Sequence, residues 1–270
     1  SLVKPSQLSW NFLFIAAISG LIGAKIFAIF EGDVQKLNPY YWNEYKDYII
    51  HLKDVLFSFS GLTFYGGLIF GTIAVIIYGL IHNMNIARLA DSFAPSLILA
   101  YGVGRLGCHF SGDGDWGIEA NMSNKPIFFP DWLWGYTFPR NVIESGELID
   151  GCQGKYCYEL INPVYPTALY EALFCIAAFI FLWQIRKRIT KPGILFCLYL
   201  IINGIERFSI ETIRITKTIN ELTGKSITLI GELTQAQFIG IIIIFIGVIG
   251  SISISLMQIK KNHKNETIKE

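Results

Sequence analysis

The sequence predicts an all-α membrane protein with about six membrane-spanning helices, and composition and segment length both lead to this class. Of the 270 residues, 52% are hydrophobic, and the mean hydropathy is +0.45. Only 16% are charged, whereas soluble domains carry about 25% charged residues. The net charge of +1 favours neither nucleic acid nor any other strongly charged partner.

Six segments are long and apolar enough to cross a bilayer, which takes about 20 residues of helix. They are residues 10–30, 55–81, 86–108, 163–185, 192–210 and 236–257. We expect a single integral membrane domain over residues 1–259, with a large extracytoplasmic loop at about 109–162. Residues 260–270 are predicted to form a cytoplasmic tail, and its last ten residues, which are polar and lysine-rich, are predicted to be disordered.

Basic residues near the ends of the spans predict the orientation, because they concentrate on the cytoplasmic side. One basic group links the fourth and fifth spans and another follows the sixth: Arg186, Lys187, Arg188 and Lys191, and then Lys260, Lys261 and Lys264. Both groups are expected in the cytoplasm, together with the C-terminus. Residues 31–54, 109–162 and 211–235 then face outward.

The outward loop at 109–162 is too long for a simple connection, so we expect it to be functional. Its aromatic residues Trp132, Trp134 and Tyr136 suit the headgroup layer of a membrane. Cys152 and Cys157 flank a short turn in this loop. They pair if the loop lies in an oxidising compartment, and otherwise they are two free thiols; the sequence leaves both readings open.

Ionisable side chains gather near the outward ends of three predicted spans, although such groups are costly in a membrane. The set is Arg105, His109, Asp113, Asp115, Glu171, Glu206, Arg207, Glu211 and Arg214. Opposite charges at one depth on three spans favour a functional site over charges that merely orient helices. A small transporter is disfavoured, because its charges would lie near the midplane and its sequence would carry internal repeats.

Glycine-rich stretches accompany these charges. Gly66 and Gly67 in the second span fit either a substrate site or close helix packing. The acidic turn Gly112–Gly117 lacks the further oxygen ligands of a calcium loop, so neither a metal nor a cofactor is expected.

Four stretches of the sequence resemble, in the same order, the motifs of the bacterial prolipoprotein diacylglyceryl transferases. They are Tyr65–Gly67, Gly104–Gly117, Tyr165–Glu171 and Gly204–Arg214, and Asp91, Pro95 and Gln237 fit further positions of the family pattern. The resemblance covers about Gly20 to Gly240. Members of this family have seven spans with the amino end outside, so we expect that the first span is missing from this chain.

The resemblance implies an enzyme of the bacterial inner membrane with its active site near the outer face. It transfers the diacylglyceryl group of phosphatidylglycerol to the lipobox cysteine of secreted preproteins, the first step of lipoprotein maturation, and glycerol phosphate leaves. Arginine forks suit the leaving phosphate, so Arg105 and Arg207 are assigned to it, with Arg214 as a weaker third. For the base that takes the thiol proton the order is His109, Glu211 and Tyr65. The expected substrate-binding residues are Gly66, Gly67, Gly104, Gly107, Asp113, Trp116, Gly117, Tyr165, Tyr170, Glu171 and Arg214.

Four departures from the family pattern bear on the mechanism. Tyr65 and Tyr165 stand where the family has histidine, Cys108 replaces an asparagine, and Asp113 replaces a glutamate with one residue inserted before Trp116. A mechanism with the first of these histidines as proton acceptor cannot run unchanged here. Either another group serves as the base, or the base is not essential, or the chain is an inactive relative that binds the lipid.

Overall fold

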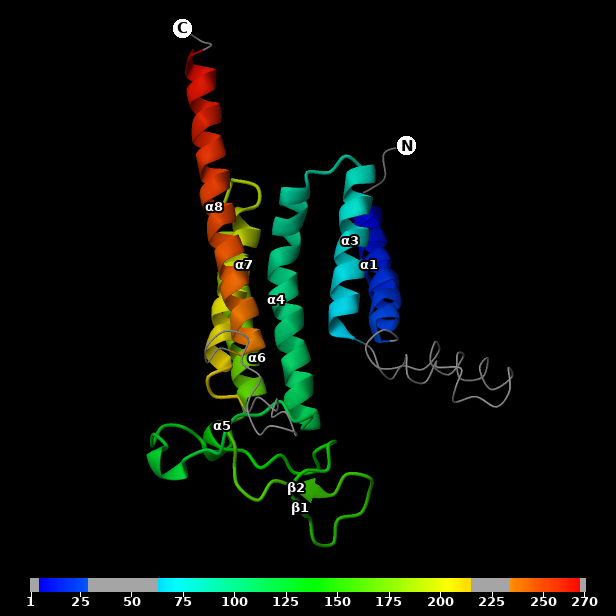
Figure 1. Ribbon diagram of the computed structural model, residues 1–270, viewed down its shortest axis with the longest axis vertical. Helices are drawn as coiled ribbons and strands as arrows, with labels where there is room; N and C mark the ends of the chain where they lie inside the picture. The colour runs from blue at the N-terminus through cyan, green and yellow to red at the C-terminus, as the bar shows by residue number, and fades with distance from the viewer. Residues whose placement is uncertain (1–4, 29–62, 215–233, 268–270) are drawn as a thin grey trace, which may run out of the picture. The chain divides into compact units, whose positions relative to one another are not determined.

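The computed structural model describes residues 5–28, 63–214 and 234–267. The long helices of this described part are α1 (Pro5–Ala28), α3 (Phe64–Ile81), α4 (Ile86–Ser111), α6 (Thr167–Ile185), α7 (Ile194–Ile210) and α8 (Gln235–Thr267) (Figure 1). The short elements between α4 and α6 are η3 (Met122–Asn124), α5 (Asp131–Trp134), β1 (Glu147–Leu148) and β2 (Tyr158–Glu159).

The helices support the predicted class. Among the described residues, 4 helices are long and apolar enough to cross a membrane, namely α4, α6, the stretch Trp10–Phe27 of α1 and the stretch Ala236–Lys260 of α8. Helix α3 adds the shorter apolar stretch Gly66–Ile81. The all-α membrane class is therefore confirmed, and the count of six spans stays a prediction. Residues 55–62 of the second predicted span lie outside the described residues.

Helix α8 corrects one expectation. It continues past the predicted end of the last span as far as Thr267. The disorder predicted for the last ten residues is therefore wrong through Thr267. An absence of apolar residues does not end a helix, because lysine, glutamate and their polar neighbours can extend one that is already formed.

The chain divides into two compact units, and the first comprises Ser1–Leu89. Its helices α1 and α3 approach at glycines: a Cβ added to Gly66 would lie 2.2 Å from the carbonyl oxygen of Gly23. Further along the same pair of helices, the rings of Phe12 and Tyr78 meet edge to face with centroids 4.9 Å apart. Close backbone packing therefore explains why Gly23 and Gly66 are glycines.

The second unit, Ala90–Glu270, contains most of α4 together with α6, α7 and α8. Its buried apolar core is formed by Ala94, Ile98, Cys175, Ala178, Leu182 and Leu195, from α4, α6 and α7. Helices α7 and α8 approach closely at Gly204, where an added Cβ would lie 2.7 Å from the carbonyl oxygen of Gly240. This packing holds the C-terminal ends of α4 and α7 and the N-terminal end of α6 in one unit.

Two helices of this unit begin at side-chain caps. The carboxylate of Asp91, on α4, accepts hydrogen bonds from the backbone N–H groups of Gly193 (2.6 Å) and Phe196 (2.8 Å) at the start of α7. At the start of α8, the Thr234 hydroxyl accepts from the Gln237 N–H (3.3 Å), and the Gln237 side chain accepts from the Thr234 N–H (3.0 Å). Asp91 and Gln237 therefore have structural roles.

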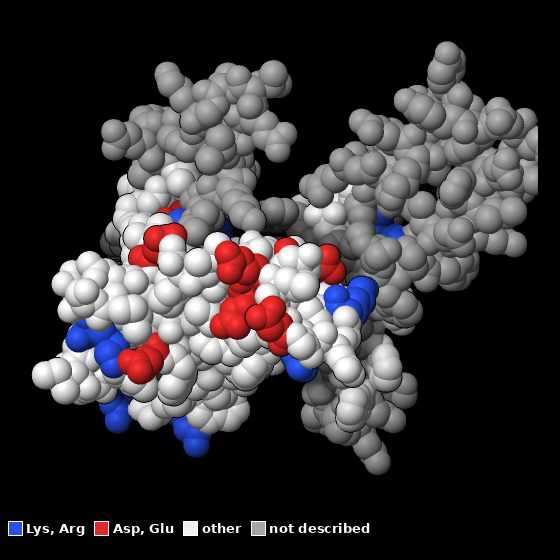
Figure 2. All heavy atoms as spheres, turned by 90° about the horizontal axis from the view of Figure 1, so that it is seen from below, with Lys and Arg blue, Asp and Glu red and all other residues white. Residues whose placement is uncertain are grey.

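The segment between α4 and α6 folds over one end of the second unit (Figure 1). Cys152 and Cys157 form a disulfide beside the β1–β2 pair, so the disulfide reading is the one that the structure contains. The buried amide of Asn141 donates to the carbonyl oxygens of Phe138, Ser145 and Tyr158. Figure 2 shows this end face-on, with several acidic side chains among mostly uncharged surface.

The cap at Asp91 gives a first prediction. Replacing it in Asp91→Ala leaves two N–H groups at the start of α7 without their acceptor, so we expect the free energy of unfolding to fall by about 1–2 kcal/mol. Asp91→Asn is the matched control, because its single amide oxygen can still accept one of these two bonds, so its loss should be smaller. Denaturant titration of the purified protein in detergent measures both, and equal losses in the two variants would contradict the capping role.

Candidate active site

Arg105 lies in the last part of α4, one turn beyond Tyr101, and its guanidinium is bound on several sides. Its Nε donates to the Tyr101 hydroxyl (3.1 Å) and forms an ion pair with Glu171 Oε2 (2.5 Å). The Tyr101 hydroxyl in turn donates to Glu171 Oε2 (2.7 Å). Since Glu171 is only 1% exposed, this three-residue contact fixes α4 against α6 and orients the guanidinium.

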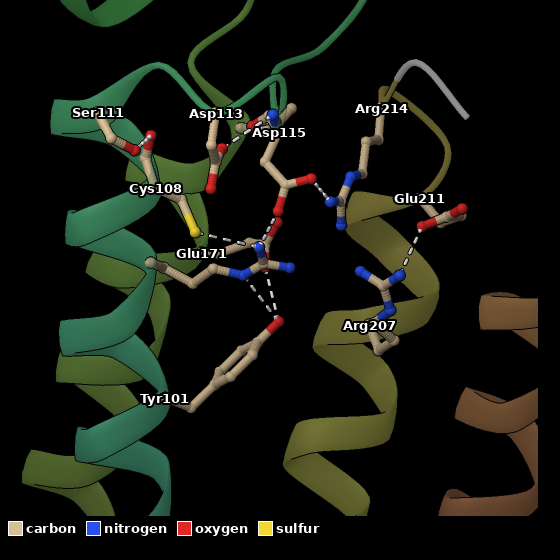
Figure 3. A network of polar contacts seen from close by, with 11 residues as sticks. Tyr101, Cys108, Ser111, Asp113, Asp115, Glu171, Arg207, Glu211 and Arg214 are labelled. Atoms are coloured by element: carbon tan, nitrogen blue, oxygen red, sulfur yellow. Dashed lines mark hydrogen bonds and ion pairs between the residues drawn. The ribbon is translucent and has the colours of Figure 1, made fainter. Parts of the chain in front are cut away.

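The carboxylate of Asp115 bridges Arg105 and Arg214. One of its carboxylate oxygens pairs with Arg105 Nη1 and the other with Arg214 Nη2 (Figure 3). Its backbone carbonyl accepts from the hydroxyl of Thr167 at 3.1 Å, at the start of α6. One residue of the long loop therefore contacts groups on α4, at the start of α6 and just beyond α7.

The backbone beside Asp115 is held by short β-type contacts. The N–H of Gly117 donates to the Tyr165 carbonyl (2.8 Å), and that of Ile118 donates to the Ile213 carbonyl (2.9 Å). A Cβ on Gly117 would lie 2.7 Å from the Ile213 carbonyl oxygen. A larger residue would displace the backbone segment that carries Arg214, which explains why position 117 is a glycine.

Arg207 and Arg214 each have one guanidinium nitrogen that makes no hydrogen bond among the described residues. Arg207 Nη2 pairs with Glu211 Oε2 at 3.3 Å, and Glu211 Oε1 accepts from the hydroxyl of Thr234 at 3.3 Å. Within the described part of the chain, Arg207 Nη1 and Arg214 Nη1 are buried without a hydrogen-bond partner. Burial and then the neighbouring charge of Arg105 lower the pKa of Arg214 from its usual value. Both groups can donate to an anion.

Glu206 is the least satisfied carboxylate of this region. It is 5% exposed, and neither of its carboxylate oxygens has a hydrogen-bond partner among the described residues. It interacts electrostatically with Glu171, Arg207 and Arg105. Glu206 belongs to the charged set predicted from the sequence, but no role is predicted for it.

Several predicted site residues meet here, and the two aspartates of the acidic turn have different surroundings. The structure brings Arg105, Glu171 and Arg214 together, with Arg207 and Glu211 on the neighbouring helix α7. Asp113, assigned as the counterpart of the family glutamate, is exposed, and its carboxylate accepts from the Asp115 N–H at 3.1 Å. Asp115 makes the two arginine contacts instead, and only the spacing of the two aspartates in the sequence hinted at the choice.

His109, first in the predicted order of bases, lies in an aromatic environment. Its ring centroid is 5.3 Å from that of Tyr136 and 5.4 Å from that of Phe138. It is 9% exposed, and Nδ1 has no hydrogen-bond partner among the described residues. No hydrogen bond joins its ring to Arg105, Arg207 or Arg214 in this part of the chain, so its surroundings differ from those of the arginines.

The other predicted substrate-binding residues of this unit either make contacts with the long loop or are glycines on an open part of α4. Trp116 packs with Phe138 and Val164 in a small buried core. The Tyr170 hydroxyl donates to the Leu133 carbonyl (2.6 Å). Tyr165 stacks edge to face on Trp134. At Gly104 and Gly107 an added Cβ would meet no heavy atom within 4 Å.

Three predicted residues, Tyr65, Gly66 and Gly67, belong to the first unit. The side chain of Tyr65 lies outside the described residues. Gly66 and Gly67 both lie where α3 contacts α1.

One group of side chains has the composition of a metal site. Ligand atoms of Cys108, Asp113 and Asp115 lie within 4.8 Å of one another. Both carboxylate oxygens of Asp115 are already paired with guanidinium groups, however. A cation would have to compete with two arginines for the same oxygens, so these residues do not fit a resident metal.

Comparison with known proteins decides the family. The sequence model of the prolipoprotein diacylglyceryl transferases matches residues 3–253. The chain belongs to the prolipoprotein diacylglyceryl transferase family. The predicted resemblance is thus confirmed over nearly the whole chain, including both compact units.

Relatives within the prolipoprotein diacylglyceryl transferases are of moderate identity. A phosphatidylglycerol–prolipoprotein diacylglyceryl transferase of Leptospira interrogans is 28% identical over 229 residues, which are 80% of this chain and 64% of the relative. Proteins of the same name from Staphylococcus saprophyticus and Staphylococcus aureus are each 31% identical, over 88% of this chain and 71% of the relative. The match therefore spans about two thirds of the length of these relatives.

The ion pair of Glu171 gives a prediction for stability. In Glu171→Gln the buried Arg105 keeps Asp115 but loses one anionic partner. Breaking a buried pair lowers stability by roughly 3–5 kcal/mol, and we expect the lower end because Asp115 remains. Asp113→Asn, on an exposed neighbour, should change the free energy of unfolding by less than about 0.5 kcal/mol. A Glu171→Gln protein as stable as the parent in denaturant titration would show that Asp115 alone holds the arginine.

Proposed function

We propose that this chain transfers the diacylglyceryl group of phosphatidylglycerol to the cysteine thiol of a secreted preprotein carrying a lipobox. The observation that carries the proposal is the buried arginine cluster at the ends of α4 and α7. Arg105 and Arg214 share Asp115, and Arg207 and Arg214 each keep a buried N–H without a partner in the described part. The family, and the name that its relatives bear, supply the reaction.

The reaction requires positively charged groups near the phosphate. The thiolate sulfur forms a bond to the glycerol carbon of the diacylglyceryl group, the bond from that carbon to the phosphate oxygen breaks, and glycerol phosphate leaves with the electron pair. Guanidinium N–H groups stabilise the growing charge on the phosphate. Arg207 and Arg214 have donors for this purpose, while Arg105 Nε and Nη1 are engaged by Tyr101, Glu171 and Asp115. Arg214 is thus a stronger candidate for binding the phosphate than the sequence indicated. Arg105 also positions Arg214 through Asp115.

The thiol must lose its proton before it attacks, because the thiolate is the nucleophile. His109 and Glu211 remain candidates for the acceptor, and the buried position of Glu206 adds a third. Tyr65 is a weaker base, since a free tyrosine has a pKa of about 10. The variants His109→Phe, Glu206→Gln and Glu211→Gln separate these possibilities in the assay below.

We propose a single domain over residues 1–259 that crosses the bacterial inner membrane six times. Its active site faces outward and its C-terminus is cytoplasmic. The link between α6 and α7 carries Arg186, Lys187, Arg188 and Lys191, whereas the much longer segment between α4 and α6 carries only Lys125, Arg140 and Lys155. This asymmetry and the disulfide Cys152–Cys157 support an extracytoplasmic loop.

A transfer assay tests the reaction. The protein in nanodiscs that contain phosphatidylglycerol is mixed with a synthetic lipobox peptide, and lipidated peptide is measured by mass spectrometry. We expect Arg207→Lys and Arg214→Lys each to lower kcat by about 100-fold, because lysine cannot replace the guanidinium fork. Arg188→Lys, in the α6–α7 link, is the matched control and should keep the parental rate.

The same assay has an outcome that defeats the proposal. If the parent transfers nothing to several lipobox peptides yet binds phosphatidylglycerol saturably, the chain is an inactive lipid-binding relative. The tyrosines at Tyr65 and Tyr165, where the family has histidine, are the features that motivate this second candidate.

Cysteine labelling tests the orientation. Ser123→Cys places a thiol on the exposed surface of the long loop, and Thr190→Cys places one on the exposed link after α6. A maleimide that does not cross membranes should label the first variant in intact spheroplasts and the second after permeabilisation alone. The reverse pattern would invert the topology.

A further inference from the structure

Glu206 is a buried carboxylic acid that makes no hydrogen bond within the described part of the chain. It lies on α7, it is 5% exposed, and neither of its two carboxylate oxygens has a donor among the described residues. An ionised carboxylate in such a place is costly, because burial removes the water that stabilises its charge. Glu206 therefore requires either a cation that balances its charge or a proton that removes it.

The arginines of the cluster are already matched by other carboxylates. Each of the three is paired with a carboxylate other than Glu206, in the ion pairs Arg105–Glu171, Arg105–Asp115, Arg214–Asp115 and Arg207–Glu211. Three positive charges thus face three negative charges before Glu206 is counted. An ionised Glu206 would leave this largely buried cluster with an excess negative charge, whereas a protonated Glu206 leaves it balanced.

The groups that act on Glu206 electrostatically lie on three helices. They are Tyr101 and Arg105 of α4, Glu171 and Cys175 of α6, and Arg207 of α7. Residues 235–259 of α8 contain no titratable side chain. Of the two glutamates, Glu171 is the better stabilised anion, because it accepts from the Tyr101 hydroxyl and pairs with Arg105. A proton bound by this pair of carboxylates therefore resides on Glu206.

An anion at the arginines adds to the negative charge around Glu206. Arg207 Nη1 and Arg214 Nη1, the buried nitrogens without a partner in the described part, are the donors assigned above to the lipid phosphate. Glu206 precedes Arg207 in the chain and interacts with it electrostatically. A phosphate bound by Arg207 therefore brings a further negative charge into the surroundings of Glu206, and like charges repel more strongly where water is excluded.

We propose that Glu206 carries a proton whenever phosphatidylglycerol is bound at the arginine cluster, so that an ionised Glu206 takes up a proton from solvent as the lipid binds. This inference rests on the proposed function and adds a proton-binding residue to its lipid site. It also removes Glu206 from the candidates for the thiol base, because a carboxylic acid that already holds a proton cannot accept another. The burial of both oxygens agrees with this, since neither is open to a substrate thiol.

Titration calorimetry measures this coupling without any transfer step. Dihexanoylphosphatidylglycerol, a soluble form of the lipid, is titrated into the full chain in detergent at about pH 6 and at about pH 9, a range in which buried carboxyl groups titrate. We expect the affinity of the parent for this lipid to fall by about tenfold as the pH rises, because the binding site then has to recruit the proton. Buffers of different ionisation enthalpy give the number of protons taken up. Dihexanoylphosphatidylcholine, whose headgroup has no net charge, should bind without proton uptake.

Glu206→Gln keeps the shape of the side chain but cannot ionise. It should bind the anionic lipid equally well at both pH values and take up no proton. Glu147→Gln, at an exposed carboxylate of the long loop, is the matched control and should behave like the parent. Proton uptake that persists in Glu206→Gln contradicts the proposal, and so does a parent that binds the lipid independently of pH or not at all. If Glu206→Gln fails to fold, Glu206→Met replaces the carboxyl group by an apolar side chain of similar length.

The transfer assay gives a second measurement that separates this inference from the proposed reaction. The lipid KM of the parent should rise with pH, and that of Glu206→Gln should not. A kcat lowered by about 100-fold in Glu206→Gln with an unchanged lipid KM would instead identify Glu206 as the thiol base and overturn the inference. If the parent transfers nothing, the proposed reaction fails, and proton uptake on binding of dihexanoylphosphatidylglycerol still decides the role of Glu206.

Discussion

The carboxylate of Asp115 is the contact on which the site depends. Arg105 and Arg214 are largely buried and carry like charges, and they lie together because one oxygen of Asp115 faces each of them. The same residue accepts from Thr167 through its backbone. The long loop is thereby held against the ends of α4 and α7 and the start of α6, and the same loop supplies the aromatic rings around His109. Without this bridge, electrostatic repulsion would separate the two guanidinium groups.

The sequence predicted the helices and the charged cluster because both signals are local. A run of apolar residues reveals a span wherever it packs, and an arginine or glutamate inside such a run is costly whatever its partner. The partners themselves depend on how distant segments meet. Tyr101 looked like any aromatic residue of a span, yet it bonds both Arg105 and Glu171. The choice between Asp113 and Asp115 turned on a one-residue insertion, which a linear motif cannot resolve.

His109 is a second residue whose surroundings could not be predicted from the sequence. Histidine ordinarily titrates near neutral pH, which placed His109 first among the predicted bases. The loop then supplies Tyr136 and Phe138 around the imidazole, and no local pattern in the sequence announces that contact. In contrast, the pairing of Cys152 with Cys157 was among the readings that short spacing allowed, and the loop geometry selects it.

The cap of α7 by Asp91 has a mechanical consequence. Helices α4 and α7 are joined near their N-terminal ends by this cap, and near their C-terminal ends by the Arg105–Asp115–Arg214 bridge. The two helices cannot separate at either end without uncapping one helix or exposing a buried charge. In the proposed reaction, the lipid would therefore have to enter and leave without separating α4 from α7. We therefore expect the spacing of Arg105 and Arg214 to be maintained, and any motion that admits a ligand to involve other parts of the protein.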